Sequence, residues 1–87
     1  MPAGWKQIKS GGYCNEYSSD SGSLGHSRGS EKDASLEACI YWCVATPGCF
    51  TVSYNYAYGM GCYLDPKCSK FEESGDFVSY NNSSKSH

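Results

Sequence analysis

The chain has 87 residues, with seven basic residues, nine acidic residues and a formal net charge of −2. This length suffices for one small domain, and the scattered basic residues cannot form a phosphate-neutralising stripe, which argues against nucleic acid as a partner. No apolar run approaches the roughly 20 residues that span a bilayer, so we expect no direct membrane insertion.

The first third of the chain is predicted to hold little regular structure. Residues 5–8 alternate in polarity and are predicted to form a first strand that ends at a turn near Gly11 and Gly12. Residues 16–33 are mostly serine, glycine and charged residues, which favours a loop or a pair of weak strands. Within this stretch only Leu24 is a candidate anchor to a core.

One helix is clearly predicted after this polar stretch. Ser35 is a good N-cap, Glu37 lies in the first turn where an anion is favoured, and Pro47-Gly48 ends the helix. Apolar residues recur with the period of a helix and form one buried face. These residues are Leu36, Cys39, Ile40, Cys43 and Val44.

Short strands are predicted after the helix. Residues 49–55 alternate as a half-buried strand, residues 62–64 form a second strand, and residues 77–80 form a closing strand. One helix packed on an antiparallel sheet of short strands is an α+β fold. We therefore predict a single domain over residues 1–87, with its core at about residues 5–80 and a flexible tail at residues 83–87.

The cysteines carry most of the information about the compartment. An even number of them in a chain this short indicates three disulfides, with fifteen possible pairings. The six residues are Cys14, Cys39, Cys43, Cys49, Cys62 and Cys68. Such bridges persist in oxidising compartments, so we expect a secreted or extracellular protein, or one of an organelle lumen. Each bridge can contribute about 3–4 kcal/mol to a domain this small.

Catalytic and metal chemistry have little support in the sequence. The cysteine spacings are C-x3-C and C-x5-C, which fit a zinc site poorly, and the only histidines are His26 and His87. We interpret His26 as a solvated loop residue and Glu72-Glu73 as a solvated turn. The prediction is therefore a protein that is not an enzyme and has no cofactor and no metal site.

The aromatic residues are the better functional lead, because the chain has eight tyrosines and two tryptophans. Tyr54 and Trp42 are interpreted as core residues that pack against the disulfides. A candidate binding loop between two central strands combines apolar rings with glycine-rich backbone. Its residues are Asn55, Tyr56, Tyr58 and Met60. The competing interpretation is that these tyrosines only cover a thin core.

A family resemblance depends on four segments of the chain. These are SLEACIYWC at residues 35–43, PGCF at 47–50, VSYN at 52–55 and GCYL at 61–64. Together they resemble a PAN/apple-type domain. The resemblance covers roughly Cys14 to Tyr80 and is a spacing pattern, which supports a fold better than a function.

The resemblance implies a small sheet that cradles one helix, with the helix cysteines bridged to the central strands. It implies the pairs Cys39–Cys62 and Cys43–Cys49, with Cys14–Cys68 joining the outer segments. The chain departs from the family at Cys68, because the outermost cysteine of apple-type domains usually lies later. We expect the Cys14–Cys68 bridge to contribute less than the others, because it closes a polar segment.

Modules of this family mediate protein–protein or protein–carbohydrate contacts in extracellular proteins. The expected function is therefore that of a non-catalytic extracellular recognition or adhesion module that binds a protein or glycan partner. The alternative is a small structural accessory subunit of a larger assembly in an oxidising compartment. Two overlapping glycosylation sequons, at Asn81 and Asn82, fit a secreted eukaryotic chain.

Overall fold

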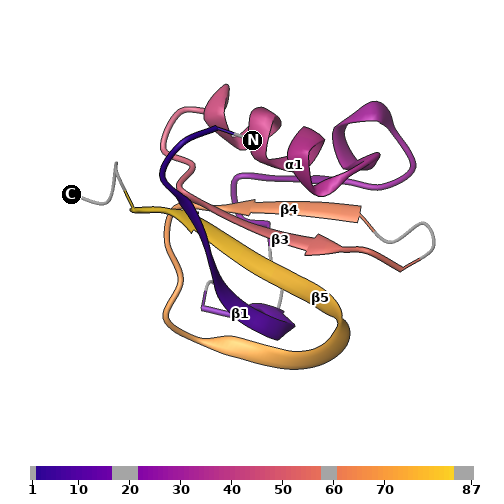
Figure 1. The fold of residues 1–87 in the computed structure, drawn as a ribbon, viewed down its shortest axis with the longest axis vertical. Coiled ribbons are helices and arrows are strands. Elements are labelled where there is room, and N and C mark those ends of the chain that lie inside the picture. The colour runs from indigo at the N-terminus through magenta and orange to yellow at the C-terminus, as the bar shows by residue number, and fades with distance from the viewer. Residues whose placement is uncertain (1, 17–21, 58–60, 84–87) are drawn as a thin grey trace.

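The computed structural model describes residues 2–16, 22–57 and 61–83, and it confirms the α+β class. One nine-residue helix lies on a five-stranded antiparallel sheet with strand order β1-β5-β3-β4-β2 (Figure 1). In chain order the elements are β1 (Trp5–Cys14), β2 (Gly25–Ser27), the 3-10 helix η1 (Glu31–Asp33), α1 (Leu36–Val44), β3 (Thr51–Asn55), β4 (Gly61–Asp65) and β5 (Phe71–Asn82). Within the described residues, no helix is long and apolar enough to cross a membrane.

Helix α1 begins where the sequence predicts. The Ser35 hydroxyl accepts a hydrogen bond from the Ala38 backbone N–H at 3.0 Å, which satisfies one of the free donors of the first turn. The helix ends at Val44, three residues before Pro47. The prediction of a buried Val44 is wrong, because this side chain is 42% exposed and the buried face narrows to the middle of the helix.

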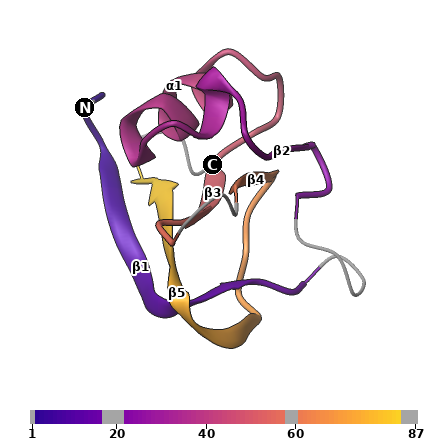
Figure 2. The same ribbon diagram turned by 90° about the vertical axis from the view of Figure 1, so that its right-hand side faces the viewer.

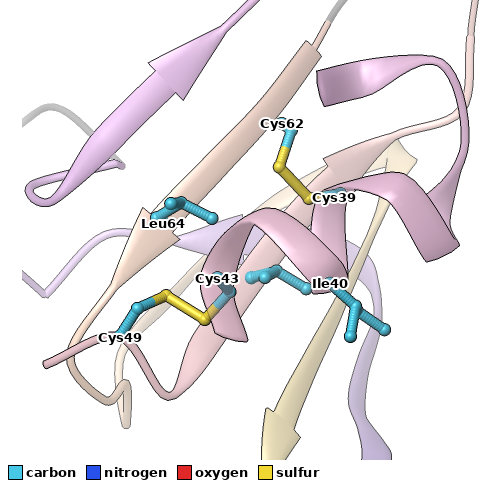
Figure 3. Close-up of a cluster of buried hydrophobic side chains, with 7 residues drawn as sticks. Cys39, Ile40, Cys43, Cys49, Cys62 and Leu64 are labelled. Carbon is cyan, nitrogen blue, oxygen red and sulfur yellow. A yellow bond between two sulfur atoms is a disulfide. The ribbon is translucent and has the colours of Figure 1, made fainter. Parts of the chain in front are cut away.

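The face of the sheet under α1 holds an apolar core fastened by two disulfides. Cys39 of the helix is bonded to Cys62 of β4, and Cys43 is bonded to Cys49 just before β3. Figure 3 shows both bridges between the helix and the strands, with Ile40 beside them. The buried members of this core are Cys39, Ile40, Cys43, Cys49, Val52, Cys62 and Leu64. As predicted, Tyr54 and Trp42 pack against this core.

Strands β1 and β5 are longer than the sequence predicts. Strand β1 does not end at the glycines but continues to Cys14, with register shifts on either side of Ser10. Gly11 has a φ of +78°, which is typical of a bulge inside a strand as well as of a turn. Strand β5 begins at Phe71, so Glu72 and Glu73 lie in a strand paired with β1 and not in a turn.

Strands β1 and β5, the first and last of the chain, pair with each other and curl together over the face of the sheet that α1 leaves open, which we call the β1–β5 side. Figure 2 shows β1 and β5 side by side, bending at the end farthest from α1. Although β5 separates β1 from β3 in the sheet, the Cys14 N–H donates to Ser53 Oγ of β3 at 3.0 Å. The Cys14–Cys68 disulfide closes this side, and Cys14 is fully buried. Cys68 is half-buried between the exposed residues Lys67 and Ser69, so the bridge joins a buried strand end to a surface segment.

Polar contacts, not Leu24, anchor the segment that leads into β2. Leu24 is 37% exposed, so it is not a core anchor. The fully buried carboxylate of Asp65 accepts hydrogen bonds from the backbone N–H groups of Gly22 and Ser23, at 3.1 and 2.8 Å. The Leu24 N–H then donates to the Leu64 carbonyl oxygen at 2.9 Å. Two charge-assisted bonds to one buried carboxylate fix this loop against β4.

Candidate recognition surface

The predicted binding loop lies at the end of β3, and the structure describes only part of it. Asn55 ends β3, Tyr56 follows it, and β4 begins at Gly61. Tyr58 and Met60 lie outside the described residues. Among the described residues, Tyr56 is the most exposed large hydrophobic side chain, at 57%.

Two hydrogen bonds hold Tyr56 in place although its ring is exposed. Its hydroxyl donates to the Gly75 carbonyl oxygen at 2.6 Å, and its backbone N–H donates to the Asp76 carbonyl oxygen at 3.0 Å. Both acceptors belong to β5, so the end of β3 is fixed to the neighbouring strand. A tyrosine held in this way presents an apolar ring face with little loss of side-chain freedom on binding.

Asn55 has a different place in this loop. The residue is buried, with only 6% of its surface exposed. Its amide oxygen accepts a hydrogen bond from the Ala57 backbone N–H at 2.8 Å, two residues further on. An asparagine that bonds its own backbone in this way shapes a turn. Asn55 thus positions Tyr56 and presents little surface of its own.

A row of four aromatic rings crosses the sheet on the face opposite α1, and sequence reasoning missed it. His26 of β2 stacks on Tyr63 of β4, with ring centroids 4.3 Å apart and an interplanar angle of 9°. Tyr63 is 5.6 Å from Phe77 of β5, and Phe77 is 4.9 Å from Tyr13 of β1. Tyr63 lies opposite Ser53 of β3 and Phe77 lies opposite Asn55 of β3, so the two rings meet diagonally across this strand.

This aromatic row is mainly a second core. Phe77 is buried, Tyr63 and Tyr13 are half-buried, and His26 alone is exposed. The interpretation of His26 as a solvated loop residue is therefore wrong in part, because it lies in a strand and stacks on Tyr63. The alternation of Tyr63 with buried Cys62 and Leu64 was the available signal, but the pairing of β2 with β4 was not visible in the sequence.

The helix carries the other exposed aromatic residue of note. Tyr41 is 53% exposed on the outer side of α1, beside a half-buried Trp42. The ammonium of Lys32 lies 5.0 Å from the centre of the Trp42 ring, at cation–π distance. No hydrogen bond of Tyr41's side chain to another described residue is seen, so this tyrosine is a useful contrast to Tyr56.

Charged groups on the surface form local contacts rather than a reactive cluster. Hydrogen bonds from the Ser69 backbone and hydroxyl lower the pKa of the Glu16 carboxyl below its usual value of 4.5. Lys9, 2.9 Å away, lowers the pKa of Glu73 in the same way. Among residues 2–16, 22–57 and 61–83, no three His, Cys, Asp or Glu side chains gather so as to hold a metal ion.

Comparisons with family models, with curated proteins and with solved structures each found no match to this chain.

Proposed function

We propose that the chain is a non-catalytic recognition module of an oxidising compartment, and that it binds a protein or carbohydrate partner with the turn after β3. The observation that carries this proposal is the fixed and exposed ring of Tyr56. Three disulfides support the oxidising compartment. The resemblance to PAN/apple-type domains supports the same class of function and an extracellular location.

Tyrosine suits such a surface for two physical reasons. Its ring offers a rigid apolar face that can be buried against a protein or a sugar ring, and its hydroxyl adds a polar tip. In Tyr56 that tip is already bonded to Gly75, so the ring face is the part left for a partner. Tyr58 and Met60 of the same turn belong to the proposed surface, while Asn55 shapes it from within.

The test compares Tyr56→Ala with Tyr41→Ala, because these two tyrosines are similarly exposed at different places on the domain. A glycan array and a panel of purified extracellular proteins would first identify a ligand. We then expect Tyr56→Ala to lower the affinity for that ligand at least tenfold with a nearly unchanged melting temperature, as for a central interface aromatic. Tyr41→Ala should leave both quantities unchanged.

A Tyr56→Phe variant separates the ring from its anchor, because it keeps the ring and removes the bond to Gly75. We expect an intermediate loss of affinity. Unchanged binding by Tyr56→Ala, or an equal loss in Tyr41→Ala, would contradict the proposed surface. Stable co-purification with a large assembly and no ligand for the isolated domain would instead favour a structural accessory subunit.

A further inference from the structure

The two overlapping sequons at the end of β5 are not equivalent in the folded domain. Asn81-Asn82-Ser83 would direct a glycan to Asn81, and Asn82-Ser83-Ser84 would direct one to Asn82. Both acceptors lie in β5, where successive side chains point to opposite faces of the sheet. The two asparagines therefore have different surroundings.

Asn82 lies on the face of the sheet that α1 covers. Its strand neighbour Tyr80 packs against the apolar core, and its partner on β1 is Trp5, which packs there as well. The residue is only 4% exposed, and its backbone N–H donates to the Phe50 carbonyl oxygen at 2.9 Å. A bulky hydrophilic glycan on this side chain would have to displace the packing around Trp5.

Asn81 lies on the opposite face and is only half-buried. Its neighbour on β1 is Lys6, which is exposed, and its neighbour on β3 is Thr51. Thr51 and Asn55 are the two ends of β3, so Asn81 lies about 13 Å along the strand direction from the start of the Tyr56 turn. A glycan on Asn81 would leave both the helix-side core and the Tyr56 turn uncovered.

We propose that Asn81, and not Asn82, is an N-glycosylation site of this domain. The three disulfides place folding in an oxidising compartment, and the lumen of the endoplasmic reticulum is one such compartment. The co-substrate is an oligosaccharide linked to a lipid pyrophosphate. The Asn81 amide nitrogen forms a bond to C1 of the first sugar and loses a proton, while the bond between C1 and the pyrophosphate oxygen breaks. The lipid pyrophosphate leaves with the electron pair, and nothing is oxidised or reduced.

Two single substitutions separate the sequons without changing either asparagine. Ser83→Ala removes the Asn81 sequon and keeps the Asn82 sequon, whereas Ser84→Ala does the reverse. The full chain is secreted from a eukaryotic cell line, and its intact mass is measured before and after treatment with peptide-N-glycosidase. We expect one glycan on the wild type and on Ser84→Ala, with Asn81 converted to Asp by the enzyme, and no glycan on Ser83→Ala.

Ser83→Ala also removes a hydrogen bond from Ser83 Oγ to the Gly4 carbonyl oxygen, so a second pair of variants guards against a folding defect. Ser83→Thr keeps the Asn81 sequon and should keep the glycan, while Asn81→Gln keeps Ser83 and should lose it. Secretion of an unglycosylated wild type, a glycan on Asn82, or a glycan retained in Asn81→Gln would each overturn the proposal.

Discussion

The two faces of the sheet are buried by different means. The helix side contains apolar side chains and two disulfides, both within the segment from Cys39 to Cys62. The β1–β5 side contains a buried polar chain, the aromatic row from His26 to Tyr13, and one disulfide that spans 54 residues, Cys14–Cys68. Apolar packing is non-directional and depends on volume, whereas a buried polar group is stable only when its hydrogen bonds are made.

A chain of hydrogen bonds on the β1–β5 side links strands β1, β3 and β5 through two serines. The Cys14 N–H donates to Ser53 Oγ, and Ser79 Oγ donates to the Gly12 carbonyl oxygen at 2.9 Å. Since each hydroxyl has one proton, Ser53 Oγ must donate to Ser79 Oγ across the 3.0 Å between them. Every polar group in this hydrogen-bond chain has a partner, and both serines are fully buried. The β1–β5 side therefore depends on the geometry of these hydrogen bonds as well as on ring packing, whereas the helix side is held by apolar packing and two disulfides.

The largest expected effect comes from removing the long-range bridges. In the chain-entropy model, closed loops of 54, 23 and 6 residues correspond to about 4, 3.5 and 2 kcal/mol. We expect Cys14→Ala/Cys68→Ala and Cys39→Ala/Cys62→Ala each to lower the free energy of unfolding by about 3–5 kcal/mol. Urea unfolding curves measure both losses.

The third bridge is the control for this prediction. Cys43→Ala/Cys49→Ala should cost about 2 kcal/mol, because its loop is short. If Cys14→Ala/Cys68→Ala left the free energy of unfolding nearly unchanged, the disulfide on the β1–β5 side would contribute little to global stability. A short-loop variant that is the least stable of the three would show that helix-side packing, and not loop closure, dominates.

A smaller effect should follow from breaking the polar chain. Ser53→Ala leaves the buried Cys14 N–H without its acceptor and removes the donor to Ser79. We expect a loss of about 1–3 kcal/mol in the free energy of unfolding, the usual cost of an unsatisfied buried group. Faster hydrogen exchange at the Cys14 amide would locate the defect.

Ser10→Ala is the matched control for Ser53→Ala, because Ser10 is an exposed serine of β1. It should change the stability by less than about 0.5 kcal/mol. Equal stabilities of Ser53→Ala and the wild type would mean that the hydrogen bonds of Ser53 contribute nothing to the stability of the β1–β5 side.

The smallest expected effect is a pH dependence of the stability, which arises at Glu16 between the end of β1 and the start of β5. The Ser69 hydrogen bonds lower the folded-state pKa of Glu16, so the charged carboxylate stabilises the folded state above the ordinary value of 4.5. That contribution is lost as the pH falls from 4.5 through the lower folded-state pKa. We expect Glu16→Gln to melt slightly below the wild type at pH 7.

The pH series itself supplies the check on Glu16. Melting temperatures of Glu16→Gln and the wild type should converge once the pH falls below the lowered folded-state pKa of Glu16, because both side chains are then uncharged in the folded protein. A gap that stays constant down to the lowest pH would mean that the shape of the side chain, and not its charge, fixes the contact with Ser69.

The parts of the fold set by local chemistry were predictable. Ser35 and the helical spacing of Cys39 and Cys43 are short-range signals, and α1 begins where they indicate. Gly11 was misinterpreted because a positive φ serves a turn and a bulge alike, and only the pairing of β1 with β5 distinguishes them. The strand around Glu72 was not predicted because this part of β5 is exposed and therefore has no apolar pattern.

The candidate site was predictable to a similar degree. The position of Tyr56 between two strands follows from local alternation, and its exposure follows from the glycine-rich turn. The inward role of Asn55 and the anchor at Gly75 do not, because both depend on contacts that form only in the folded chain. The stack of His26 on Tyr63 depends on strand register in the same way.

The sequence by itself determined the α+β class, the one helix and an oxidising compartment, because these follow from periodicity, capping and an even number of cysteines within a short chain. Only the tertiary structure decided that strands β1 and β5 curl over the face opposite α1, that Ser53 is a core residue and that Asn81 and Asn82 differ in exposure. The physical reason is distance along the chain: these features are set by strand pairings between residues far apart in the sequence, and a side chain changes faces with every one-residue change of register.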